Sequence, residues 1–239
     1  MNRILRGVLP ALAAVGITAT IGAAQAVPSS YQYIQKNRSL TAYAGYLFTN
    51  PGVALPDSQN ADLGPQSAPL FGVRYSLRVG GPLSLEGNVA FSPSQRKLYN
   101  AVLDPDTAHI VVTETGDEVS EPLVLAEAAV RFHLTGDRTY RGLAPFVLAS
   151  GGAVMGLGGT SDAEKDIPEH RRFDFGPGLA VSVGTGVDFF PSQRMSLRTE
   201  VDYRLWRMAA PAGLLRAGAG KVSEWGENIG VTVGAAYHF

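Results

Sequence analysis

Charged residues stand at every second position in parts of the chain, most clearly at Arg198, Glu200, Asp202 and Arg204. Arginine and carboxylate groups that meet away from water form strong, charge-assisted hydrogen bonds, whereas a ring of charges of one sign selects ions. Both kinds of chemistry require that these side chains share one enclosed space. The secondary structure that carries them therefore decides what they can do.

The residues between these charges indicate a β-strand. Met195, Leu197, Thr199, Val201 and Tyr203 alternate with the charged positions, so one face is largely apolar and the other is charged. Similar alternation predicts eight strands, near residues 39–48, 68–80, 82–93, 121–135, 143–157, 173–190, 193–207 and 225–239. Most of them exceed the ~5–6 residues typical of soluble strands and approach the ~9–11 residues that cross a bilayer.

The N-terminus predicts export. Arg3 and Arg6 precede an apolar run that ends in Ala24-Gln25-Ala26, the pattern of a signal peptide cleaved after residue 26. We therefore expect a signal peptide over 1–26 and a single barrel domain over 27–239. No later apolar run approaches the roughly 18 residues of a membrane-spanning helix, so a mature chain that enters a membrane does so as strands.

Composition excludes several classes of protein. Residues 1–26 hold two of the 20 basic residues and none of the 21 acidic ones, so the mature chain carries 18 (20 − 2) basic against 21 acidic residues, a net charge of −3. This balance gives no indication of a nucleic-acid partner. The absence of cysteine excludes disulfides, a lipoprotein anchor and thiol chemistry.

Short connections alternate with long ones. Gly80-Gly81-Pro82, Thr135-Gly136-Asp137 and Pro191-Ser192-Gln193 carry turn residues, whereas 49–67, 94–120, 158–172 and 208–224 are predicted to be long solvated loops. With an even number of strands, all long connections lie at one end. In a transmembrane barrel that end is extracellular, and the short turns and both termini are periplasmic.

Aromatic residues near the strand ends suit girdles at the two membrane interfaces. These residues are Tyr46, Phe48, Phe91, Tyr99, Phe173, Phe189, Phe190, Trp206, Trp225, Tyr237 and Phe239. The sequence therefore predicts an all-β fold, an antiparallel up-and-down transmembrane β-barrel of about eight strands.

The last strand resembles the C-terminal signal of outer-membrane barrels. It reads Thr232-Val233-Gly234-Ala235-Ala236-Tyr237-His238-Phe239, with Gly234, Tyr237 and Phe239 as the candidate assembly signal. The segments 176–189 and 197–204 are similar to the penultimate hairpin of small porin-family barrels, such as the outer membrane protein A, opacity and W-type barrels. The resemblance implies a Gram-negative outer-membrane location and recognition by the barrel-assembly machinery, but these relatives share no single activity.

The inward face is where chemistry is expected. Alternation gathers five cations and six anions there: Arg74, Arg78, Arg131, Arg198, Arg204, Glu86, Glu127, Asp174, Asp188, Glu200 and Asp202. An eight-stranded barrel is just wide enough for its own side chains. Because leaving one partner of a buried pair alone costs roughly 3–5 kcal/mol, we expect these charges to pair and to plug the lumen. A conducting channel is the alternative.

No catalytic residue, metal site or cofactor is predicted. The histidine patterns of the barrel enzymes that modify lipid A are absent; the histidines are His109 and His170 in predicted loops, His133 facing inward and His238 next to the end. The acidic run Asp162, Glu164, Asp166 and Glu169 lacks the spacing of a calcium loop, which favours solvated acids.

The long loops are the expected interaction surface. Arg171 and Arg172 are candidates to contact the phosphates of lipopolysaccharide, a geometry suited to arginine. We expect a structural or interaction role, with lipopolysaccharide, a host surface or an envelope protein as partner. The alternatives are a small-solute or hydrophobic-compound channel, a barrel subunit of an envelope or motility machine, and a lipid-modifying enzyme.

Overall fold

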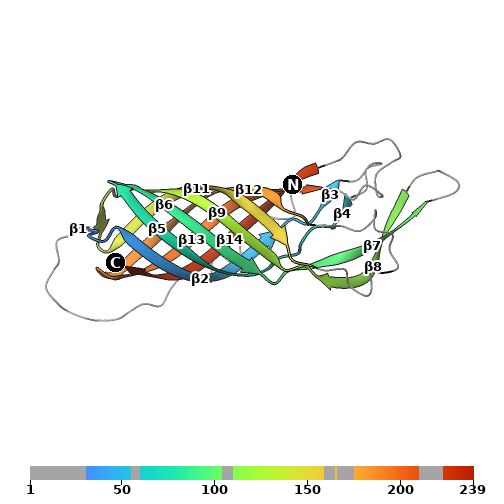
Figure 1. Cartoon of the computed structure of the whole chain (residues 1–239), viewed down its shortest axis with the longest axis horizontal. Coiled ribbons are helices and arrows are strands. Elements are labelled where there is room, and N and C mark those ends of the chain that lie inside the picture. Colours follow the sequence, from blue (N-terminus) through green and yellow to red (C-terminus); the bar gives the residue numbers. More distant parts are fainter. Residues whose placement is uncertain (1–30, 55–59, 104–109, 159–164, 166–174, 210–222) are drawn as a thin grey trace.

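The chain folds as a closed antiparallel β-barrel. The computed structural model describes residues 31–54, 60–103, 110–158, 165, 175–209 and 223–239, and the regular elements of this part are strands. Each barrel strand pairs with the one before it, and the last closes the ring on the first (Figure 1). Eight of the described strands form the ring: β2 (Arg38–Thr49), β5 (Ala68–Gly80), β6 (Leu83–Ser92), β9 (Leu123–His133), β11 (Leu143–Gly156), β12 (Gly178–Ser192), β13 (Met195–Ala209) and β14 (Ser223–His238). The predicted fold class is confirmed.

Alternation along the strands sets the inside and the outside of the barrel. In β6, Leu83 and Leu85 are exposed on the outer wall, whereas Ser84 and Glu86 are buried in the lumen. All eight strands expose large apolar side chains on the outer wall. A water-soluble protein has the opposite arrangement, because it buries most side chains of this kind in its core. An apolar surface of this extent marks contact with an apolar medium or partner. Among the described residues, no helix has the length and hydropathy to cross a membrane.

The two ends of the barrel differ (Figure 1). One end, here the short-turn end, carries the tight β5–β6 and β12–β13 turns, the small β1 (Tyr31–Tyr33) and β10 (Arg138–Tyr140) pair, and the C-terminus. The other, the long-loop end, carries two extra antiparallel pairs. These are β3 (Val53–Ala54) with β4 (Asn60–Ala61), and a longer hairpin of β7 (Gln95–Leu103) with β8 (Ile110–Ser120).

The prediction of a solvated loop over residues 94–120 is wrong, because β7 and β8 form a hairpin there. Its register opposes Leu103 with Ile110 and Val102 with Val111, and β-branched and apolar residues facing each other favour strand pairing over coil. The strand predicted from residue 173 enters the barrel ladder only at Gly178, after Pro177, which has no N–H to donate. The predicted signal peptide lies outside the described residues.

Candidate functional site

Charged side chains pair across the lumen, and Glu86 lies at the centre of their network. Its carboxylate is fully buried, with Oε1 3.0 Å from Arg131 Nε and 3.2 Å from Arg198 Nη1, and Oε2 3.6 Å from Arg74 Nε. The Ser76 hydroxyl donates to Oε1 over 2.7 Å. One carboxylate therefore ties β6 to cations on β5, β9 and β13.

A second carboxylate, Asp188 of β12, shares two of these arginines. Its Oδ2 lies 2.9 Å from Arg131 Nη1 and its Oδ1 lies 2.8 Å from Arg198 Nε. The His133 ring places Nε2 3.3 Å from Oδ2. Two arginines thus lie between two acids, so that each buried charge in this group has more than one partner of opposite sign.

The network continues toward the long-loop end. Arg74 donates to both oxygens of Glu200, over 2.6 and 2.8 Å, which is the bidentate geometry that binds carboxylates most strongly. Further along, Arg204 Nη2 lies 3.1 Å from Glu127 Oε2 and 3.1 Å from Asp202 Oδ1. The Arg74–Glu200 and Arg204–Glu127 contacts join strands that are far apart in the sequence.

Aromatic side chains fill the space between the ion pairs. The Tyr43 hydroxyl donates to Asn88 Oδ1 over 2.7 Å. The Phe146 ring lies 5.3 Å from the Arg131 guanidinium and 4.9 Å from that of Arg198, within cation–π range. A Cβ added at Gly186 would lie 2.5 Å from Phe146 Cζ, so this glycine leaves room for the ring. Sequence reasoning missed both aromatics, although alternation places them on the inward face of β2 and β11.

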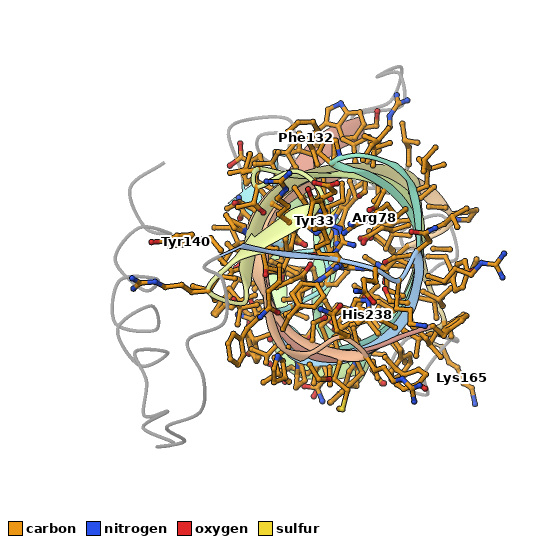
Figure 2. The ribbon with its side chains drawn as sticks, turned by 90° about the vertical axis from the view of Figure 1, so that its left-hand side faces the viewer. Tyr33, Arg78, Phe132, Tyr140, Lys165 and His238 are labelled. Atoms are coloured by element: carbon orange, nitrogen blue, oxygen red, sulfur yellow. The ribbon has the colours of Figure 1, made fainter. Side chains whose placement is uncertain are left out.

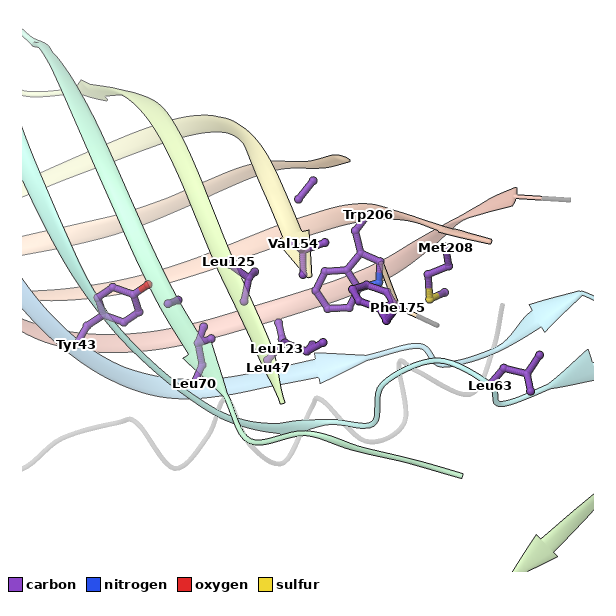
Figure 3. Packing of buried hydrophobic residues seen from close by; sticks show 12 residues of the cluster. Tyr43, Leu47, Leu63, Leu70, Leu123, Leu125, Val154, Phe175, Trp206 and Met208 are labelled. Carbon is purple, nitrogen blue, oxygen red and sulfur yellow. The ribbon is translucent and has the colours of Figure 1, made fainter. Parts of the chain in front are cut away.

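A cluster of apolar side chains lies toward the long-loop end of the lumen. Buried residues gather there between the strands and the adjoining loops: Leu47, Leu63, Leu70, Leu123, Leu125, Val154, Phe175, Ala180, Trp206 and Met208 (Figure 3). The Trp206 ring is 1% exposed and packs edge-on against Phe175 at 5.8 Å, so its predicted place in an interface girdle is wrong. Trp206 follows the inward positions of β13, which explains its burial. This apolar cluster packs among the strands and loops at the long-loop end.

The short-turn end opens into a pocket with a different lining. Arg78 and His238 lie inside the ring of strands when the barrel is viewed from this end, and the segment after β1 crosses the opening (Figure 2). The pocket is also lined by Arg131, His133 and Phe190. Phe190 lies 5.1 Å from the His238 ring inside this mouth, so its predicted girdle position is also wrong.

The predicted site residues divide into three groups. Ten of the eleven inward charges lie on the inner face, five arginines and five carboxylates: Arg74, Arg78, Arg131, Arg198, Arg204, Glu86, Glu127, Asp188, Glu200 and Asp202. Asp174, Arg171 and Arg172 lie outside the described residues, as do His109, His170 and the four acids between 162 and 169. At the C-terminus, Gly234 faces inward, whereas Tyr237 and Phe239 lie exposed on the outer wall with their rings stacked at 6.3 Å.

Histidine contacts at the short-turn end do not form a hydrolytic triad in the described part of the chain. Ser196 Oγ lies 2.7 Å from His238 Nε2, a pair that sequence reasoning did not anticipate. Ser196 is 1% exposed, and the carboxylate of Asp188 bonds to His133 instead. A nucleophile needs both access and a base oriented by an acid, so this pair holds β13 to β14. No cluster of metal-ligating side chains occurs among the described residues.

The β7–β8 hairpin is fastened to the barrel and to the preceding loop. Arg96 and Glu121 form a buried ion pair of 3.0 Å at its base. The Asp62 backbone N–H donates to the Tyr99 hydroxyl over 3.1 Å. Higher up, Lys97 Nζ lies 2.8 Å from Glu114, and this hydrogen bond raises the pKa of Lys97. Tyr99 therefore belongs to the hairpin, and its predicted place in a girdle is wrong.

Comparison with known proteins supports the fold and gives no family. The chain matches no protein-family model and no curated protein sequence. Among solved structures it is similar to Neisserial surface protein A, with a TM-score of 0.52 and 11% identity over 84% of this chain and 97% of that one. It is also similar to the outer membrane protein OprG from Pseudomonas aeruginosa, with a TM-score of 0.51 and 12% identity over 85% of this chain and 97% of that one. At these identities the likeness concerns the fold alone.

Proposed function

We propose that this protein is an integral outer-membrane β-barrel that acts through its long-loop end as an interaction surface. The observation that carries the proposal is the combination of an apolar outer wall with a lumen filled by paired charges. The wall suits a lipid bilayer, and each strand of the closed ring pairs with a neighbour on both sides, which leaves the ring without an open edge, as a membrane core demands. The signal-peptide pattern of residues 1–26 and the terminal Gly234, Tyr237 and Phe239 support export and handling by the barrel-assembly machinery.

We place the long-loop end outside the cell and the short-turn end in the periplasm. This orientation rests on the rule that outer-membrane barrels have short periplasmic turns and long extracellular loops. The exposed Tyr46 and Trp225 toward one end of the wall, and Phe189 and Tyr237 toward the other, suit the two interfaces.

The lumen supports a structural or binding role more than conduction. Its five arginines and five carboxylates balance in number, and in the middle of the lumen the two signs lie in contact with each other, unlike a ring of one charge that selects ions. The apolar cluster around Trp206 adds a layer of apolar side chains between these charges and the long-loop end. Interaction is therefore assigned to the surface beyond the barrel, where β7 and β8 project (Figure 1).

The partner class that suits this surface best is lipopolysaccharide or another envelope or cell-surface component. Arg171 and Arg172 belong to a long connection at the same end and supply guanidinium groups for phosphates. A barrel subunit of a larger envelope machine would use the same surface.

Shortening the hairpin tests this role. Replacing residues 100–113 by Asn-Gly joins Tyr99 to Glu114, which are register partners, through a favoured two-residue turn. The refolded variant should keep the heat-dependent gel migration of a barrel and should lose binding to lipopolysaccharide or to cross-linked envelope partners by about tenfold or more. Arg194→Gln at the opposite end is the control and should bind normally. A shortened variant that binds as well as the wild type would refute the role of the hairpin.

A second candidate is the uptake of a small hydrophobic compound. One observation favours it: the long-loop half of the lumen is lined by Leu47, Leu125 and Trp206, which would contact an apolar molecule. Entry would require the cluster to open, and Trp206 fluorescence offers the readout, with Trp225 replaced by Phe. Saturable quenching by an apolar ligand would favour this candidate, whereas unchanged fluorescence would favour the closed barrel.

A further inference from the structure

Basic side chains form half of the lining of the pocket at the short-turn end. Six of its lining residues carry basic groups: Lys36, Arg38, Arg78, Arg131, His133 and His238. No aspartate or glutamate is among the described residues that line it. Elsewhere in the lumen, cations and carboxylates lie at contact distance from each other. This pocket differs because its described lining contributes cations without a carboxylate.

Arg78 differs from the other inward arginines. Arg74, Arg131, Arg198 and Arg204 each lie within 4 Å of at least one buried carboxylate. For Arg78, the structure gives no ion pair among the described residues, and its guanidinium donates only to the Ile34 carbonyl, over a long 3.4 Å. A guanidinium presents five donors, so most of its hydrogen-bonding capacity is directed at the pocket or at solvent.

A second donor or acceptor in the pocket wall is unused. His133 is 1% exposed, and its Nε2 is engaged with Asp188. Its buried Nδ1 has no hydrogen-bond partner among the described residues. Because Nε2 faces the Asp188 carboxylate it carries the ring proton, so Nδ1 is an acceptor and is not a ligand for an anion.

The pocket is framed by a fixed segment of the chain. The segment between β1 and β2 crosses the opening: the Ile34 N–H donates to the Asp137 carbonyl over 2.9 Å, and the Arg78 N–H donates to the Asn37 carbonyl over 2.7 Å. Arg138 donates to the Tyr33 hydroxyl and its guanidinium lies 4.5 Å from the Tyr33 ring. The lip of the pocket is thus held in place before any ligand arrives, which lowers the entropy cost of binding.

We infer that an oxyanion of the phosphate class binds at the open mouth of this pocket, with Arg78 as its principal ligand. A phosphate offers several acceptor oxygens to the Arg78 fork and neutralises the excess positive charge of the mouth. Ser39 and Ser84, both buried in the lining, supply hydroxyl groups of suitable chemistry. Free inorganic phosphate and the phosphoryl headgroup of an anionic phospholipid share this chemistry.

Titration with inorganic phosphate tests the site. The full chain is refolded in a maltoside detergent, which contains no phosphate. Calorimetry or phosphorus NMR should give one saturable site in the wild type. Arg78→Gln should weaken it by at least about tenfold, the effect of losing one charge-assisted contact, and Arg78→Lys by less. Arg194→Gln removes the same charge from an exposed turn at the same end, outside the pocket, and should change affinity less than twofold.

A second arm identifies the source of the phosphate. The same variants are equilibrated with phosphatidylglycerol in the detergent, and the retained lipid is measured by mass spectrometry. Loss of lipid retention in Arg78→Gln alone assigns the site to a headgroup, whereas loss of inorganic phosphate binding alone assigns it to a soluble anion. The inference is overturned if the wild type binds neither probe. It is also overturned if Arg78→Gln binds both probes as well as the control Arg194→Gln does. If Arg78→Gln fails to fold, the wild-type titrations and Arg78→Lys decide.

Discussion

Removing the Glu86 carboxylate perturbs the centre of the charge network in the lumen. Glu86→Ala deprives Arg74, Arg131 and Arg198 of a shared anion and leaves the Ser76 hydroxyl without its acceptor. The structure gives Glu86 three cationic contacts and a fully buried side chain, so water cannot replace the lost charge without entering the lumen.

The expected magnitude follows from what each arginine retains. Arg74 keeps Glu200, and Arg131 and Arg198 keep Asp188, so none is left entirely unpaired. Breaking a buried ion pair costs roughly 3–5 kcal/mol, and the remaining partners put this variant near the lower limit, at about 3 kcal/mol. Loss of the neutral Ser76 hydrogen bond adds about 1 kcal/mol.

The assay is reversible urea unfolding of the refolded protein in lipid vesicles, followed by tryptophan fluorescence. Glu86→Ala should lower the free energy of unfolding by about 3–4 kcal/mol. Glu114→Ala removes an acid from the partly exposed Lys97 pair and serves as the control, with an expected change below about 1 kcal/mol. If Glu86→Ala and Glu114→Ala were equally stable, the account of a paired, buried charge network would be refuted.

Three further outcomes follow from the same geometry. Deleting residues 237–239 removes Tyr237 and Phe239 from the outer wall and should prevent assembly, measured as heat-modifiable protein in the outer-membrane fraction; normal insertion would contradict the assigned signal. Gly186→Val should destabilise the barrel by about 1–3 kcal/mol, because its Cβ would meet the backbone oxygen of Thr199 and the ring of Phe146, whereas Gly87→Val, with no atom within 4 Å, should fold normally; equal urea midpoints would contradict this. Val201→Arg puts a charge on the outer wall of β13 and should cost about 2–4 kcal/mol in vesicles if that wall meets lipid; an unchanged midpoint would argue against bilayer contact.

Alternation was sufficient to predict the barrel because it is a local property. In β13 the pattern from Met195 to Tyr203 fixes which side chains face inward, whatever the strand pairs with. The pairing partners inside the lumen are not local. Arg74 and Glu200 lie 126 residues apart, and only the register and stagger of the closed ring bring them to 2.6 Å.

The misassigned segments have a different cause. The stretch 94–120 contains Asp, Pro and Gly, which favour loops, and these residues outweighed the strand-forming run Ile110-Val111-Val112. The frequency of aromatics at membrane interfaces predicts a girdle position for Trp206, but its place in the strand continues the inward series of Asp202 and Arg204. The two-residue period of a β-strand alone predicts that Trp206 faces the lumen. The pocket around Arg78 is built from six strands and from the segment that crosses between β1 and β2, a combination that no local pattern contains.

Single-channel recording tests the central claim most directly. The claim is that the lumen is closed, by the Glu86 and Asp188 networks in its interior and by the apolar cluster around Trp206 toward the long-loop end. Full-length protein, refolded and inserted in planar bilayers with insertion verified by protease protection, should give no discrete conductance steps in salt. Reproducible steps of uniform size, absent from empty bilayers, would contradict the closed lumen and favour a channel.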